Sequence, residues 1–299
     1  MANETYDSVL ATAFSDMMHV RAQQMRARLR PYVDYRDFGR ADQIAYDSIG
    51  TVEASELMGR NNISIPSDIT LSRRLIQRRH FSITLFIDDY DLKGALLEPH
   101  GQYAQAVVRA MERQFDIVAI QSSTADCFTG RTFTVDVPFA TDGGLTVNAT
   151  TGLTLAKLLN VQQNFNDAEV GIDMPQRIAF CIAGDERTTM LQIDQLVNTR
   201  YTSQLRLDQN GGQLRSVMDM DVIMFGANVT RPALSTAAGV RTCLAISEMG
   251  VCMGLQNEWA LTVKDRPDYV NVSQVQITGT LGGVRTEGVR VQQVSTTTF

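Results

Sequence analysis

Lysine is scarce in this chain of 299 residues: Lys93, Lys157 and Lys264 are the only three, and most other cationic side chains are arginines. Aspartate and glutamate outnumber lysine and arginine by 33 to 27, so the formal net charge at pH 7 is −6. Proteins that coat nucleic acid by neutralising phosphates are normally basic, which argues against that role for the chain as a whole. Arginine suits bidentate pairs with carboxylates between subunits, although host codon bias explains the preference equally well.

The cysteines show none of the spacings that point to zinc or redox chemistry. No two are spaced as C-x-x-C, and no cysteine lies near a histidine in the pattern of a zinc site. Cys181 lies in the apolar run 178–182, where we expect a buried free thiol. The four cysteines, Cys127, Cys181, Cys243 and Cys252, therefore indicate neither a metal centre nor an oxidising compartment.

Long hydrophobic runs are missing as well. None approaches the roughly 20 apolar residues that a membrane-spanning helix needs, and the N-terminal stretch MANETYDSVL lacks the basic-then-apolar pattern of a signal peptide. We therefore expect a soluble chain that is not exported. Its hydrophobic content of 44% and charged content of 20% are close to globular averages, so it can bury a sizeable core.

Motifs of nucleophilic and nucleotide-binding enzymes are also absent. The sequence has no G-x-S-x-G and no phosphate-binding glycine motif. The glycine pairs at 141–144, 210–212 and 281–283 are typical of turns. The histidines, His19, His80 and His100, all lie in the first third and are expected at surfaces or interfaces. The sequence thus predicts no catalytic residue, no cofactor and no enzyme activity.

The segment FIDDYD, residues 86–91, is the strongest candidate for chemistry, because it holds Asp88, Asp89 and Asp91. Converging carboxylates could bind a divalent cation. Asp88 and Asp89 are adjacent, however, and in an extended chain they point to opposite faces. Acids at this position also have an ordinary role, which is to cap the free N–H groups of a following helix. We favour the capping role and predict no metal site.

Two features dominate the N-terminal third. Apolar residues recur with the helical period from about Tyr6 to Leu29, and Pro31 should end this helix. Short alternating stretches over about 39–87 then predict a long, mostly polar β-hairpin, in which FSITLFI (81–87) places every second side chain on one apolar face. A hairpin without its own core needs another surface to lie on. Four arginines decorate it: Arg73, Arg74, Arg78 and Arg79.

The remaining sequence alternates between helical and strand patterns, which indicates a mixed α+β fold. The apolar, small-residue run 244–255 fits either a buried strand or a close-packed helix. The expected helices are 99–121, 151–166 and a third that begins near Asp185. The expected strands are 130–140, 174–184, 213–226, 270–280 and 284–295, with turns at 141–144 and 208–212.

The order of these segments resembles the major capsid proteins of tailed bacteriophages with the Hong Kong 97-type fold. The stretches that carry the resemblance are ITLFIDDYD, the long helix ending RQFDIVAIQ, TGLTLAKLLNVQQNFNDAEVG, RIAFCIAGDERTTMLQ, GQLRSVMDMDVIMF, CLAISEMGVCMGL and VQITGTLGGVRTEGVRVQQV. The likeness lies in their order and spacing, because no single motif is diagnostic.

The resemblance implies a division of the chain into segments. They are an N-terminal arm (1–38), an extended loop over a neighbouring subunit (39–86), a first peripheral part (87–171) with a spine helix at 99–121, an axial domain (172–260) and returning peripheral strands (261–299). It also makes the four hairpin arginines, with Asp88, Asp89 and Asp91, candidates for subunit interfaces. A solvated basic strand is the alternative for each arginine.

The implied function is self-assembly. Homo-hexamers and homo-pentamers would close an icosahedral shell in the host cytoplasm, as the capsid of a virion, around double-stranded DNA that they contact at most non-specifically. Because the arm begins almost at Met1, the resemblance implies a separate scaffolding protein or none; a portal and decoration proteins are further expected partners. Some relatives crosslink a loop lysine to a neighbour's asparagine, but no lysine lies in 39–86, so we do not expect that bond here.

Two alternatives stay open at this point. An encapsulin-like nanocompartment shell would share the fold and enclose a cargo enzyme. A metal-dependent enzyme would use the Asp88, Asp89 and Asp91 cluster with His100, and it would contain stoichiometric divalent metal.

Overall fold

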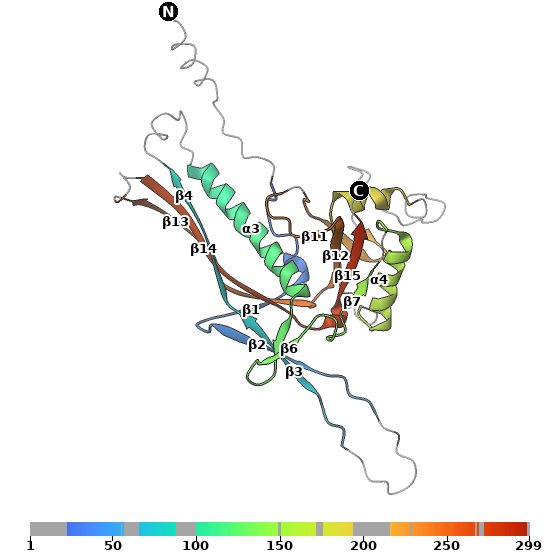
Figure 1. The fold of residues 1–299 in the computed structure, drawn as a ribbon. Coiled ribbons are helices and arrows are strands. Elements are labelled where there is room, and N and C mark those ends of the chain that lie inside the picture. The colour runs from blue at the N-terminus through green and yellow to red at the C-terminus, as the bar shows by residue number, and fades with distance from the viewer. Residues whose placement is uncertain are drawn as a thin grey trace, which may run out of the picture. The chain divides into compact units, whose positions relative to one another are not determined.

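The computed structural model describes residues 23–54, 56, 66–87, 100–148, 151–171, 176–193, 216–227, 229–266, 268 and 272–297. The chain forms two compact units, each built from separated segments (Figure 1). The smaller unit comprises Met1–Ala27, Arg79–Asp116 and Leu255–Leu281, and the larger unit comprises Arg28–Arg78, Ile117–Gly254 and Gly282–Phe299.

The described elements are mainly strands, with few helices. The helices are η1 (Arg30–Tyr32), α3 (His100–Thr124), α4 (Leu155–Asp167), α5 (Gly184–Leu191) and η3 (Gly288–Arg290). The strands are β1 (Asp34–Asp37), β2 (Gln43–Ile49), β3 (Leu71–Gln77), β4 (Arg79–Ile87), β5 (Cys127–Thr129), β6 (Val135–Val137), β7 (Leu145–Val147), β8 (Ile178–Ile182), β9 (Ser216–Val217), β10 (Met220–Met224), β11 (Thr236–Ala237), β12 (Val240–Ser247), β13 (Val251–Arg266), β14 (Val272–Arg285) and β15 (Val291–Thr297).

These strands form three sheets. One has the order β1-β13-β14-β4, a second has the order β7-β15-β12-β8-β10-β9 with β11 paired to β12, and the third has the order β2-β3-β5-β6. The predicted α+β class is therefore confirmed. None of the described helices is long and apolar enough to cross a membrane.

In the smaller unit, α3 packs on the face of β4 and β14 (Figure 1). The core between them contains Ile87, Val107, Met111, Val275 and Ile277. The predicted helix 99–121 is confirmed as α3. The alternation of FSITLFI is confirmed too, because the side chains at 81, 83, 85 and 87 are the less exposed ones. Packing is tight at Gly279, where an added Cβ atom would lie 2.5 Å from the ring of Trp259.

A single carboxylate in α3 ties three parts of the smaller unit together. Glu112 accepts a hydrogen bond from the backbone N–H of Ala27 at 2.8 Å and another from Nε1 of Trp259 at 2.6 Å. One turn further on, the buried Asp116 accepts from the side chain of Gln24. Residues 24–27 are therefore held on the helix by acidic acceptors, although the backbone of 23–27 forms no regular helix.

In the larger unit, α4 covers the seven-stranded sheet. Leu158, Val161 and Phe165 on α4 join Phe180 and Ile182 of β8 in one buried cluster. Thr154 starts α4 by accepting a hydrogen bond from the N–H of Lys157, so the helix begins four residues later than predicted. Cys181 is a buried free thiol, as expected, and the other three cysteines are buried and free as well.

A buried ion pair lies beside this sheet. Nη1 of Arg241 contacts Glu186 at 2.9 Å and Asp185 at 3.0 Å, and Glu186 also accepts from the N–H of Ala183 and the hydroxyl of Thr296. Burial alone would lower the pKa of Arg241, but its hydrogen bonds to the two carboxylates outweigh that effect and raise the pKa. Glu186 thus also caps the N-terminus of α5 by accepting from the N–H of Ala183.

The structure differs from several sequence predictions. The predicted helix 6–29 falls mostly outside the described residues, and 23–29 is irregular and followed by η1, which contains Pro31. The run 244–255 is two strands joined by a tight turn. The predicted strand 130–140 is reduced to β6, because Gly130 and Phe133 have positive φ angles of 92° and 54° and reverse the chain between β5 and β6.

The predicted hairpin is also shorter than expected. β2 and β3 pair antiparallel from Gln43↔Gln77 to Ile49↔Leu71, so the predicted strand pairing is confirmed for 43–49 with 71–77. The next strand, β4, pairs with β14 in another sheet. The C-terminal strand β15 pairs with β12 in the seven-stranded sheet. The turn at 141–144 is confirmed, whereas the predicted turn at 208–212 lies outside the described residues.

Candidate functional site at the root of the hairpin

The hairpin of β2 and β3 has two different faces. On the face that packs inward, Ile44 and Ile76 contact the buried cluster around Phe38, Cys252 and Val284. Strict alternation places Ala45, Asp47 and Ile49 on the opposite face of β2, each paired across the strands with a residue of β3. The outward face ends in two apolar side chains, Ile49 and Leu71, which stand directly opposite each other and are 71% and 76% exposed.

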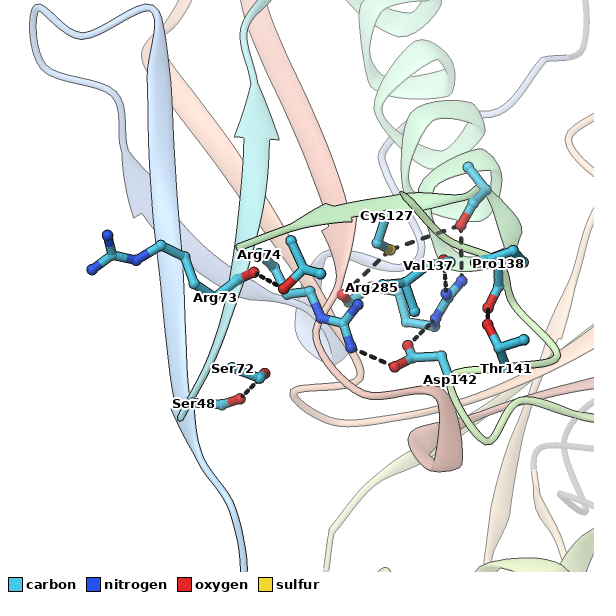
Figure 2. A network of polar contacts seen from close by, with 12 residues as sticks. Ser48, Ser72, Arg73, Arg74, Cys127, Val137, Pro138, Thr141, Asp142 and Arg285 are labelled. Atoms are coloured by element: carbon cyan, nitrogen blue, oxygen red, sulfur yellow. Dashed lines mark hydrogen bonds and ion pairs between the residues drawn. The ribbon is translucent and has the colours of Figure 1, made fainter. Parts of the chain in front are cut away.

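At the root of the hairpin, two arginines share one carboxylate (Figure 2). Asp142, in the turn 141–144, accepts a hydrogen bond from Nη2 of Arg74 on β3 with one oxygen. Its other oxygen accepts from Nε of Arg285, at the end of β14, at 2.8 Å. All three side chains are buried or nearly so. The contact joins the hairpin, a loop and the last residue of β14, all in the larger unit.

Arg285 has every donor group engaged and is fully buried. Nη1 donates to the carbonyl oxygens of Ser123 and Ala125, at 3.2 and 2.9 Å, at the end of α3, and Nη2 donates to the carbonyl of Val137 at 3.4 Å. Its guanidinium also lies over the ring of Phe139, 5.1 Å from the ring centre. Buried arginines are tolerated when their donors are satisfied in this way.

Arg74 is less well satisfied. It is 7% exposed, and only Nη2 reaches Asp142. Its Nε and Nη1 atoms are buried and have no hydrogen-bond partner among the described residues. With Arg285 and Asp142, it forms a group of two cations and one anion. The root of the hairpin therefore carries one buried positive charge that no described carboxylate balances.

Cys127 completes the group. Its Sγ lies 3.7 Å from the carbonyl oxygen of Arg285 and 3.8 Å from that of Ala125 (Figure 2). Burial raises the pKa of the Cys127 thiol, although the positive charges of Arg285 and Arg74 oppose this. The thiol is therefore neutral near pH 7 and acts as a packing group.

The other three predicted interface arginines do not belong to this buried group. Arg73 forms an exposed pair with Asp47 across the hairpin, with Nε to Oδ1 at 2.6 Å, and this hydrogen bond lowers the pKa of Asp47. Arg78 lies 3.4 Å from Asp42. Arg79 begins β4 and is exposed. These pairs are within one chain, and the interface role of the four arginines stays a prediction.

Asp88, Asp89 and Asp91 lie outside the described residues, so their predicted roles also remain predictions. Among the residues that are described, no group of three histidine, cysteine, aspartate or glutamate side chains could hold a metal ion. Sequence reasoning missed Asp142 and Arg285, which it placed in a turn and a strand without a role. The available signal was an arginine at the end of an apolar strand pattern, because an arginine that such a strand buries needs a carboxylate partner.

The fold and the family agree. The profile of the family described as "Phage capsid protein" matches residues 7–297. No curated protein matches the sequence. Several solved phage heads are similar in structure at low sequence identity. The head of Helicobacter pylori bacteriophage KHP40 has a TM-score of 0.70 at 10% identity, with 94% of each chain covered.

Two more structures extend the likeness to phages of other hosts. Mycobacterium phage Che8 has a TM-score of 0.66 at 9% identity over 94% of this chain and 95% of its own. Gordonia phage Cozz has a TM-score of 0.65 at 13% identity over 96% and 91%. At such identities the likeness shows the fold, and it confirms the predicted Hong Kong 97-type fold. With the family match over nearly its whole length, the chain belongs to the phage capsid protein family.

Proposed function

We propose that this phage capsid protein assembles, as hexamers and pentamers, into a closed icosahedral shell that encloses double-stranded DNA. The family supports a structural role in the virion capsid. The arrangement in hexamers and pentamers, the DNA content and assembly in the host cytoplasm are parts of the proposal. The net charge of −6 fits a wall that surrounds DNA without binding it tightly.

One observation carries the proposal best, and it is the outward face of the hairpin. Ile49 and Leu71 are mostly exposed, and so are Val52 and Ile69 in the described segments 50–54, which follows β2, and 66–70, which precedes β3. These segments lead away from the other strands of their sheet (Figure 1). A paired apolar surface on a projecting hairpin fits contact with a second copy of the chain, because isolated hairpins gain stability only against another surface.

The segment names remain part of the proposal. The extended loop, assigned to 39–86, would project as the hairpin 43–77, since β4 belongs to another sheet. The peripheral domain would hold α3 with β4 and β14. The axial domain, assigned to 172–260, would be the seven-stranded sheet, which also takes in β15. A separate scaffolding protein, a portal and decoration proteins are the expected partners.

Electron microscopy of the purified chain tests the proposal. Closed shells or capsomers, seen with the chain alone or with the phage's scaffolding protein, are the expected result. A monomer at high concentration under both conditions would refute shell assembly. The contents of the particles separate the proposal from a nanocompartment, because packaged nucleic acid supports the capsid and a protein cargo supports the alternative.

A further inference from the structure

We propose that Arg74 is a positioning residue for assembly, whose buried ion pair with Asp142 sets the direction in which the hairpin leaves the larger unit. The link to assembly rests on the proposed function. The effect on the hairpin itself is a property of the single chain.

Arg285 and Asp142 form a complete ion pair without Arg74. Arg285 donates to Asp142 and to three backbone carbonyls, and its charge is balanced by that carboxylate. Nothing in the packing of the α3 end or of the turn 141–144 calls for a second cation. A pair of this kind, with satisfied donors, is a sufficient structural unit.

Arg74 is energetically unfavourable at this place. It brings a second positive charge into a buried place, and two of its three donor nitrogens have no hydrogen-bond partner among the described residues. Burying polar groups without partners is unfavourable, and an apolar side chain of similar volume is often at least as stabilising. Stability alone therefore does not explain an arginine here. We infer that the contact it makes serves the placement of the hairpin.

Arg74 lies where the hairpin leaves its sheet. The hairpin joins the neighbouring strand β5 at one register pair, Arg74↔Thr129, next to which the hydroxyl of Thr129 donates to the carbonyl of Arg73 at 2.6 Å. Beyond this point, toward Leu71, β2 is the only described strand that lies beside β3. Arg74 is therefore the last residue at which the hairpin is tied to its sheet, and its side chain fixes that residue to the turn 141–144.

A small rotation at Arg74 produces a larger displacement further along the hairpin. The chain from Arg74 to Pro66 spans up to roughly 26 Å at about 3.3 Å per residue. A turn of about 10° at Arg74 would then displace Pro66 by roughly 4–5 Å, at the extended-chain rise per residue. The same turn displaces Leu71, three residues from Arg74, by roughly 1.7 Å at that rise, so the shift of the exposed apolar side chains grows along the hairpin away from its root. Holding the hairpin in one direction before contact lowers the cost of ordering it on assembly.

Arg74→Met tests the inference on the unassembled chain. Spin labels on Ile49→Cys and Thr188→Cys report the distance between the hairpin and α5, and the native cysteines are buried. We expect the distance distribution to widen clearly while the unfolding temperature stays within roughly 3 °C of the parent, since the lost pair is near neutral for stability. Arg131→Met, an exposed arginine in the β5–β6 loop, is the matched control and should change neither.

Each other outcome counts against the proposal. An unchanged distribution in Arg74→Met would show that the hairpin is positioned without this residue. A fall in unfolding temperature of more than roughly 8 °C would show a structural role instead, because a replacement that is near neutral for stability lowers the unfolding temperature by much less. Arg74→Lys keeps a cation within reach of Asp142, so it should restore much of the narrow distribution; failure to do so would also contradict the assignment.

The link to assembly has its own readout. If the parent chain forms shells, Arg74→Met should raise the concentration needed for assembly at least about tenfold, which is about 1.4 kcal/mol per subunit. Normal assembly with a widened distribution would overturn the assembly role and leave the hairpin contact standing. If the parent forms no shells under any condition, the proposed function fails, and the spin-label result still decides the positioning of the hairpin.

Discussion

Replacing the exposed apolar pair of the hairpin should block assembly and leave the fold intact. The change is Ile49→Ser together with Leu71→Ser. Fully burying one such side chain contributes about 1.5–3 kcal/mol. Ile49 is 71% exposed in the single chain and Leu71 is 76% exposed. Burying this surface against a second copy therefore contributes about 1–2 kcal/mol per residue. The pair is thus worth about 2–4 kcal/mol per hairpin.

The assay is light scattering over a concentration series, with circular dichroism on the same samples. A loss of about 2–4 kcal/mol per subunit corresponds to a rise of roughly 30- to 700-fold in the concentration needed for assembly. The unfolding free energy should stay within about 0.5 kcal/mol, because both side chains are at the surface. The volume-conserving swap Ile49→Leu with Leu71→Ile is the control and should assemble normally. Normal assembly of the serine variant would refute the reasoning.

Three further predictions concern the stability of the single chain. Arg241→Met leaves the carboxylate of Glu186 buried without its cationic partner and should lower the free energy of unfolding, measured with urea, by about 3–5 kcal/mol. The control Arg266→Met breaks an exposed pair and should lower it by less than about 1 kcal/mol. Equal losses in the two variants would contradict the role of burial. Glu112→Ala removes the acceptor shared by the N–H of Ala27 and the indole of Trp259. It should lower the free energy of unfolding, measured by the same method, by about 2–4 kcal/mol. A change below about 0.5 kcal/mol would show that water replaces both hydrogen bonds. Burial raises the pKa of Cys243 from 9.0 to about 12, so its contribution to stability is complete below pH 9 and is lost as the pH rises toward 12, because only the unfolded thiol ionises there. Cys243→Ala should reduce the alkaline loss by up to about 1.4 kcal/mol per pH unit between pH 9 and 10.5, and an unchanged slope would rule out this thiol.

Local patterns in the sequence predicted local structure well. The alternation of FSITLFI and the stripe of α3 were enough to place a strand and a long helix that pack on each other, because both periods are strong over their length. The run 244–255 was ambiguous for a physical reason. Small and apolar residues without alternation fit a strand buried on both faces or a packed helix equally, and only the pairing of β12 with β8 and β15 decides between them.

The candidate site shows where local patterns stop. Arg74 and Arg285 were visible as arginines, but their shared carboxylate is 68 residues from one and 143 from the other. No period or motif links residues that far apart, so Asp142 stood only as a turn residue. The same limit explains the hairpin boundary. β4 continues the polar alternation of β3 across Arg78, and its membership of another sheet depends on β14, nearly 200 residues later.

The segment order of the smaller unit has a consequence for synthesis on the ribosome. Its segments end at Asp116 and resume at Leu255, so about 140 residues must be added before β13 and β14 can join β4. At about 5–20 residues per second, this takes roughly 7–28 s. During that time the apolar faces of β4 and α3 wait without their partner strands. We therefore expect nascent chains to depend on host chaperones over this interval, and stalling before residue 255 to yield aggregates.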